Sequence, residues 1–169
     1  GPHKALARLE SRKLYCRKLL RKYGLDKYSP SWRSWTPPPT TDIPDILDNV
    51  AKNRVTTEAI NQEFKTRQFS YIENEVRQYM NDLLGQFVIK ADGLKGGKGV
   101  FVSQDHFQTI EEGLLLCQEL YNNKETFVIE EKLIGEEFSL ISFCDGKNFV
   151  HAPMVKDYKR ALNSNQGPN

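Results

Sequence analysis

Cysteine is scarce in this chain: only Cys16, Cys117 and Cys144 occur among 169 residues. They are odd in number, far apart and without C-x-x-C spacing, which argues against a zinc ribbon and favours reduced thiols in a cytoplasmic compartment. The three histidines are equally scattered and predict no metal site. No apolar run reaches the roughly 18–20 residues that cross a bilayer, so the sequence predicts no membrane segment.

Charge of one sign is not in excess either. The 24 Lys and Arg residues and the 22 Asp and Glu residues leave a net charge of +2, which is too small to imply a nucleic-acid partner by itself. With 38% hydrophobic and 27% charged residues, the composition is typical of a globular protein rather than a disordered one. No internal repeat is present, and the chain is long enough to bury one sizeable core or parts of two small ones.

The first segment, residues 3–23, is predicted to be a basic helix that ends at Gly24. Two interpretations of its charge stay open. The cations could follow the phosphate backbone of a nucleic acid, or they could form a solvated helix face. Its apolar residues at near-helical spacing are Leu6, Leu9, Leu19, Leu20 and Tyr23, and its basic residues are Lys4, Arg8, Arg12, Lys13, Arg17, Lys18, Arg21 and Lys22.

Residues 28–57 are predicted to form an extended surface loop, because three consecutive prolines follow Trp32 and Trp35. Packing of the loop against the domain is the expected use of both tryptophans.

Two helices are predicted after this loop. A short one covers residues 58–64, and a longer one covers residues 70–84 with an apolar stripe along one side. Ser70 and Glu73 have the spacing of a capping box at the start of the longer helix.

Residues 87–102 are predicted to form a strand, a glycine-rich turn and a second strand. Gly93, Gly96, Gly97 and Gly99 fall within seven positions, and the absence of a Cβ would let backbone N–H groups close on an anion. The pattern is not a Walker A loop, which would carry Ser or Thr after Gly-Lys and lead into a helix. An anion loop on a hairpin and an ordinary glycine-rich hairpin with surface lysines both remain possible.

The second half of the chain is predicted to be mainly β. A helix over residues 109–121 is predicted to begin with a capping box, with Leu114, Leu115, Cys117 and Leu120 available for burial. Strands are then predicted over residues 126–131, 138–143 and 148–154, and the tail from residue 156 is loop-like. The fold class is therefore α+β with antiparallel pairing.

A second informative stretch covers residues 128–140. Four acidic residues surround a short apolar bend between two predicted strands. A strand, a bend and an acid in that order can supply a backbone edge for adenine, an acceptor for its amino group and a carboxylate for ribose hydroxyls. An exposed acidic turn would explain the same residues.

Together the two stretches resemble an ATP-grasp ligase. Four segments are similar, in order, to motifs of the glycinamide ribonucleotide synthetase (phosphoribosylamine–glycine ligase) family: residues 1–13, 88–100, 128–140, and 156–160 with 167–169. The resemblance implies a partial ATP-grasp fold, with an antiparallel sheet and a glycine-rich lid hairpin packed by helices. It divides the chain into an opening core helix (1–29), a variable proline-containing insertion (30–69), a lid subdomain (70–127) and the incomplete start of the core sheet with the substrate-side loop (128–169).

The resemblance also implies residue roles. ATP phosphates would meet two lysines and the glycines that let the loop fold, and the adenosine would meet residues of the acidic stretch. For ATP the residues are Lys90, Gly96, Gly97, Lys98, Gly99, Glu130 (adenine amino group), Leu133 (backbone, adenine edge) and Glu137 (ribose); Lys159 and Arg160 are implied on the acyl-phosphate side, and Asp157 and Asn169 on the substrate side.

The implied reaction belongs to purine biosynthesis. The carboxylate of glycine attacks the γ-phosphate of ATP to give glycyl phosphate, and phosphoribosylamine then displaces phosphate. The implied cofactors are ATP and Mg²⁺, with the metal ligands expected outside this chain, so this piece alone is expected to be inactive. The sequence predicts no oligomeric state.

The substrate-side loop departs from the family pattern at Lys156, Tyr158 and Asn165. Two alternatives therefore remain: an ATP-grasp carboxylate–amine ligase with a different acceptor, and a non-catalytic basic module that binds nucleic acid.

Overall fold

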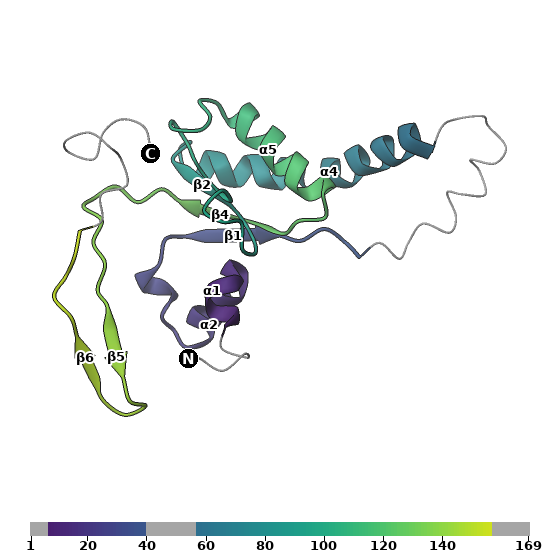
Figure 1. The fold of residues 1–169 in the computed structure, drawn as a ribbon. Coiled ribbons are helices and arrows are strands. Elements are labelled where there is room, and N and C mark those ends of the chain that lie inside the picture. The colour runs from purple at the N-terminus through teal and green to yellow at the C-terminus, as the bar shows by residue number, and fades with distance from the viewer. Residues whose placement is uncertain (1–6, 40–56, 157–169) are drawn as a thin grey trace. The chain divides into compact units, whose positions relative to one another are not determined.

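The computed structural model describes residues 7–39 and 57–156, with the side chains of residues 57–67 outside that description (Figure 1). The chain divides into two units, Gly1–Lys132 and Leu133–Asn169. No helix in the described ranges is both long and apolar enough to cross a membrane.

The first unit contains a four-stranded antiparallel sheet with the order β1-β4-β2-β3. The hairpin of β2 and β3, with its connecting loop at residues 92–99, is called the lid hairpin below. It confirms the predicted strand, glycine-rich turn and strand, and the whole unit confirms the predicted α+β class. The strands are β1 (Trp32–Trp35), β2 (Phe87–Ala91), β3 (Val100–Val102) and β4 (Phe127–Glu131).

Helices α4 (Thr57–Asp82) and α5 (Ile110–Asn122) cover one face of the sheet, and the hydrophobic core lies between them and the strands (Figure 1). Alternate residues of each strand point to opposite faces. Three alternate residues of β2 therefore enter this core, whereas Lys90 lies on the opposite face. The largest fully buried core side chains are Phe69, Phe87, Phe127, Met80, Ile89, Ile129 and Val76.

The start of α5 confirms the predicted cap. The Thr109 hydroxyl accepts a hydrogen bond from the Glu112 backbone N–H over 3.2 Å, while the Glu112 carboxylate accepts from the Gln108 N–H over 2.6 Å. Of the four residues available for burial, Leu114, Cys117 and Leu120 are buried, whereas Leu115 is 65% exposed. It follows Leu114 directly and so lies about 100° further around the helix.

The predicted single helix at residues 3–23 is wrong in one respect. It is two helices, α1 (Arg8–Ser11) and α2 (Lys13–Lys22), because Arg12 between them is extended with φ −133° and ψ 101°. The predicted stop is confirmed: Gly24 has φ +68°, and the next N–H returns to the Leu20 carbonyl over 2.8 Å. A short 3₁₀ helix, η1 (Asp26–Tyr28), leads from there to β1.

The prediction of an extended surface loop over residues 28–57 is wrong at Trp32 and Trp35, the two ends of β1. Both side chains are buried, as their expected packing role requires. Trp35 stacks on Phe127 in the core with ring centroids 5.4 Å apart, whereas the Arg21 guanidinium of α2 lies 4.1 Å from the Trp32 ring centroid. Residues three apart on a strand face opposite sides, so the two tryptophans help to anchor helices on both faces of the sheet.

The predicted helix start at Ser70 is also wrong, because Ser70 lies inside the continuous helix α4. This helix runs through the predicted domain boundary at residues 69 and 70, and β4 runs through the boundary at residues 127 and 128. The division of the chain into four segments stays a prediction.

The second unit contains a small hairpin of β5 (Ser142–Cys144) and β6 (Phe149–His151). Both strands are shorter than predicted, although an isolated bridge between Ser139 and Val155 extends the pairing. The turn has the predicted chemistry: Asp145 accepts hydrogen bonds from two following backbone N–H groups, and Gly146 has φ +99°.

Candidate functional site

The sheet face opposite α4 and α5 carries a buried carboxylate, Glu130 of β4, which is 2% exposed. Arg17 of α2 binds it with two parallel hydrogen bonds, Nε to Oε1 over 2.7 Å and Nη2 to Oε2 over 2.8 Å. Lys90 of β2 adds an ion pair from Nζ to Oε2 over 2.6 Å. A cation from α2 and a cation from β2 thus bind the same carboxylate on β4.

This network decides the charge of Glu130. Burial disfavours the carboxylate and by itself would raise the pKa of Glu130, but the hydrogen bonds from Arg17 and Lys90 outweigh burial and the pKa is lowered. The side chain is therefore a carboxylate at neutral pH. Glu130 and Lys90, which the resemblance assigns to adenine and phosphate, are partners of each other in this structure.

The start of α2 is bound to the base of the lid hairpin. Lys13 Nζ donates to the backbone carbonyls of Ala91 and Gly93, each over 2.9 Å. Asp92 Oδ1 accepts from the backbone N–H of Leu14 over 3.1 Å, which satisfies one of the free donors at the helix start. These contacts join the start of α2 to the end of β2 and the first residues of the loop.

Lys13 and Lys90 are close enough to affect each other. Burial lowers the pKa of Lys13, and the like charge of Lys90 lowers it further, while Asp92 and Glu130 oppose the change. Sequence reasoning missed Lys13 and Arg17 as site residues. Their spacing of four places both on one face of α2, and this periodicity was the available signal.

The loop of the lid hairpin uses its glycines in two ways. Gly96 and Gly97 have φ values of +56° and +81°, in the region where residues with a Cβ are strained. A Cβ on Gly99 would instead lie 2.7 Å from Lys95 Cγ, which is closer than van der Waals contact allows. Lys95 in turn pairs with Glu125 over 2.6 Å and ties the loop to the segment after α5.

Lys98 lies in the exposed tip of this loop. Its backbone N–H donates to the Lys95 carbonyl over 3.0 Å, which closes a tight turn around Gly96 and Gly97. No ion pair joins the Lys98 ammonium to another residue in the part of the chain that the structure describes. Lys98 and Lys90 therefore lie at the tip and on the base strand of one hairpin.

The remaining predicted residues either belong to the second unit or lie outside the described residues. Leu133 and Glu137 belong to the second unit, where Leu133 is 67% exposed. The substrate-side residues lie outside the described residues: Asp157, Lys159, Arg160 and Asn169. Within residues 7–39 and 57–156, no group of three or more His, Cys, Asp and Glu side chains could hold a metal ion.

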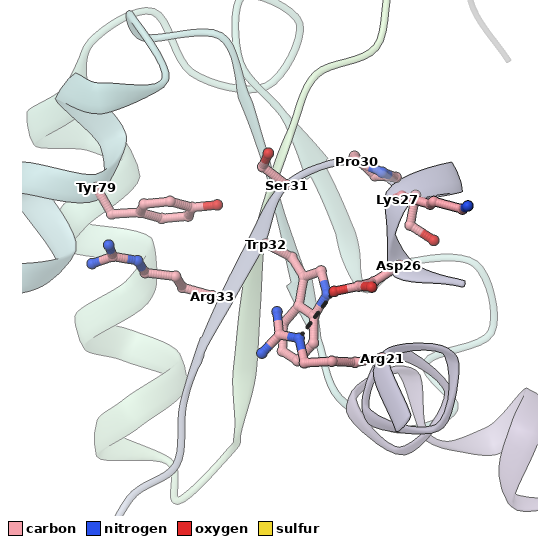
Figure 2. Close-up of a pocket in the computed structure, with 9 residues that line it drawn as sticks. Arg21, Asp26, Lys27, Pro30, Ser31, Trp32, Arg33 and Tyr79 are labelled. Atoms are coloured by element: carbon pink, nitrogen blue, oxygen red, sulfur yellow. Dashed lines mark hydrogen bonds and ion pairs between the residues drawn. The ribbon is translucent and has the colours of Figure 1, made fainter. Parts of the chain in front are cut away.

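A hollow of about 530 Å³ lies at the start of β1 (Figure 2). Figure 2 shows Tyr79 reaching this region from α4 and Trp32 from β1, with an Arg21–Asp26 ion pair alongside. The Tyr79 hydroxyl and the Trp32 indole nitrogen are buried with no hydrogen-bond partner in the described structure. Burial raises the pKa of Tyr79, and the neighbouring Arg33 opposes that change. No residue to which the resemblance assigns a role lines this hollow.

Comparison with known proteins gives a consistent result. The model of the phosphoribosylglycinamide synthetase ATP-grasp (A) domain matches residues 49–169. A phosphoribosylamine–glycine ligase of Thermotoga maritima is 31% identical across 100% of this chain, and the crystal structure of this ligase superposes with a TM-score of 0.64. The ligase of that name from Methanocorpusculum labreanum is 32% identical across the whole chain, and the one from Streptococcus suis is 41% identical across 60% of it.

The fold is thus an ATP-grasp fold, as the resemblance implied. The chain belongs to the phosphoribosylglycinamide synthetase family. It spans about a third of the length of the first two relatives, 34% of the Thermotoga protein and 30% of the Methanocorpusculum protein, and the match to the Streptococcus protein covers 24% of that protein.

Proposed function

We propose that this chain is the ATP-binding lid part of a ligase that joins glycine to 5-phosphoribosylamine in purine biosynthesis. The observation that carries the proposal is the glycine-rich lid hairpin with Lys90 on its base strand and Lys13 beside it, in a chain that belongs to this family. Clustered ammonium groups and open glycine backbone suit the phosphates of ATP. The products would be glycinamide ribonucleotide, ADP and phosphate.

In this reaction the chain aligns charges rather than moving protons. Lys90 and Lys98 would neutralise the phosphoryl group as it passes to the carboxylate of glycine, and the glycines let the loop close over it. A closed loop keeps water from the glycyl phosphate until the amine attacks. Glu130, Leu133 and Glu137 would hold the adenosine.

Mg²⁺, which supplies additional charge neutralisation on the phosphates when bound, finds no cluster of protein ligands among the described residues. The substrate-side roles of Asp157, Lys159, Arg160 and Asn169 remain part of the proposal. Water-soluble small molecules are the proposed partners, and the cytoplasm is the proposed compartment.

The nucleic-acid alternative is not favoured, because four cations of the basic segment already have partners within the chain. Arg17 binds Glu130 of β4, and Lys13 binds the base of the lid hairpin. Arg12 pairs with Asp92, and Arg21 lies against Trp32. A steep salt dependence of nucleic-acid affinity would restore this alternative.

Hydrogen exchange of the intact protein tests the nucleotide site. Mg·ATP is expected to slow exchange in residues 88–102, and exchange in the loop after β3 serves as the internal control. No protection of residues 88–102 would remove the main support for ATP binding. Phosphate release that requires glycine and phosphoribosylamine tests the substrates, and release that requires another acid or amine would refute the named pair.

A further inference from the structure

Arg17 makes a contact in this cluster that the proposed nucleotide roles do not use. It lies on α2, its side chain is 18% exposed, and both Nε and Nη2 donate hydrogen bonds to Glu130. Lys90 is somewhat more exposed, at 25%, and donates only one hydrogen bond to the same carboxylate. The two cations thus hold Glu130 with different geometry.

The hydrogen-bonding capacity of the carboxylate shows what each cation leaves open. Glu130 Oε2 accepts from both Arg17 and Lys90, whereas Oε1 accepts from Arg17 alone. A carboxylate has about four acceptor positions, so one position at Oε1 stays available for a further donor. The Lys90 ammonium likewise keeps two of its three N–H donors for another acceptor.

The consequences of losing either cation differ. If Lys90 turns away, Glu130 keeps two charge-assisted hydrogen bonds and a balancing positive charge. If Arg17 were absent, Lys90 would be the last cation on a buried carboxylate, and its departure would leave that charge unpaired in a poorly solvated place. Arg17 therefore determines how freely Lys90 can leave.

We propose that Arg17 is a positioning residue for the nucleotide site. It keeps Glu130 oriented and its negative charge balanced, which frees Lys90 to exchange from Glu130 to a nucleotide phosphate. This inference rests on the proposed ATP-binding function. The anchoring of α2 gives geometric support. Asp92 accepts a hydrogen bond from the backbone N–H of Leu14 and so holds in place the helix that carries Arg17.

The test separates phosphate binding from adenosine binding in the intact protein. Calorimetry gives the dissociation constants of adenosine and of ATP. The adenosine constant divided by the ATP constant measures what the phosphates contribute to binding, and this quotient is called the ratio below. Arg17→Met is expected to lower this ratio by about tenfold, the scale of one charge-assisted hydrogen bond. Arg21→Met is the matched control, because Arg21 lies one turn further along α2 and contacts Trp32 and Asp26 instead. It should leave the ratio within about twofold.

A second experiment repeats the Arg17→Met substitution in a Glu130→Gln background. A neutral amide at this position cannot hold Lys90 as an ion pair, so adding Arg17→Met to Glu130→Gln should leave the ratio unchanged. A merely structural role of Arg17 would instead lower it equally in both backgrounds, which overturns the proposal. Arg17→Lys keeps the positive charge but cannot form the two parallel hydrogen bonds, so this variant is expected to lower the ratio by less than Arg17→Met does. If Arg17→Met does not fold, a wild-type ratio in Arg17→Lys overturns the proposal.

Failure of the proposed function gives a different result. Wild-type protein that binds ATP no better than adenosine would refute phosphate binding as a whole. Wild-type protein that prefers ATP and loses the preference in Lys90→Met, but not in Arg17→Met, would refute the role of Arg17 alone.

Discussion

The carboxylate of Asp92 caps helix α2 through the backbone N–H of Leu14, which lies 78 positions earlier in the chain. The helix starts at extended Arg12, whose own side chain makes no capping hydrogen bond. The lid hairpin thus supplies the cap that the helix sequence lacks. The opening helix and the lid hairpin are therefore expected to gain stability together.

Replacing Asp92 tests this coupling. Asp92→Ala removes the cap and is expected to lower the free energy of unfolding by about 1–2 kcal/mol, because the side chain is only 8% exposed and water replaces it poorly. Asp92→Asn keeps an acceptor oxygen and is the matched control, with a smaller loss. Denaturant unfolding measures both, and equal stability of Asp92→Ala and wild type would show that the cap contributes nothing.

Tyr79 offers a substitution that should not destabilise the protein. Its hydroxyl is buried without a partner in the described structure, so Tyr79→Phe is expected to raise the unfolding free energy by about 1 kcal/mol. Tyr71→Phe is the control, since Tyr71 is 85% exposed and should show no change. A loss of stability in Tyr79→Phe, measured by the same unfolding experiment, would mean that a water molecule or another group satisfies the hydroxyl.

The stability of the turn between β5 and β6 should depend on pH. Backbone N–H groups of Asn148 and Lys147 lower the pKa of Asp145 to about 2. An aspartate in an unfolded chain has a pKa of about 3.9. The stability that the Asp145 hydrogen bonds contribute is therefore fully present above about pH 4 and is lost as the pH falls towards 2. Amide chemical shifts of Asn148 and Lys147 should follow this titration. Asp145→Asn should abolish it, and a midpoint near 4 in the wild type would refute the turn contacts.

Sequence predicted the features that depend on neighbouring residues. The glycine-rich turn, the Thr109 cap and the Gly24 helix stop all arise from local backbone chemistry, and each is present. The glycine requirement at position 99 was predicted for loop closure, but the structure adds a different reason, the close approach of Lys95.

Features that depend on distant partners were missed. β1 forms because β4 pairs with it, and four residues before a proline run carry too short a pattern to predict this strand. Arg17 and Glu130 are separated by 113 positions, so the sequence shows a basic helix and an acidic strand without showing that they meet. The substrate-side predictions, Lys159 and Arg160 among them, lie outside the described residues.

Lys98 is the sharpest test of the lid itself. The side chain lies in the exposed loop tip and makes no ion pair within the described residues, so its removal should disturb the fold little. Lys98→Ala is expected to weaken ATP binding by about 1–3 kcal/mol, the range of a hydrogen bond to a charged group, with unchanged thermal unfolding. Lys22→Ala, at the exposed last residue of α2 in the same unit, is the matched control and should leave affinity unchanged. Calorimetric titration with Mg·ATP measures both variants. Wild-type affinity in Lys98→Ala would exclude a phosphate contact by this lysine while leaving the Lys90 and Lys13 cluster to carry the binding.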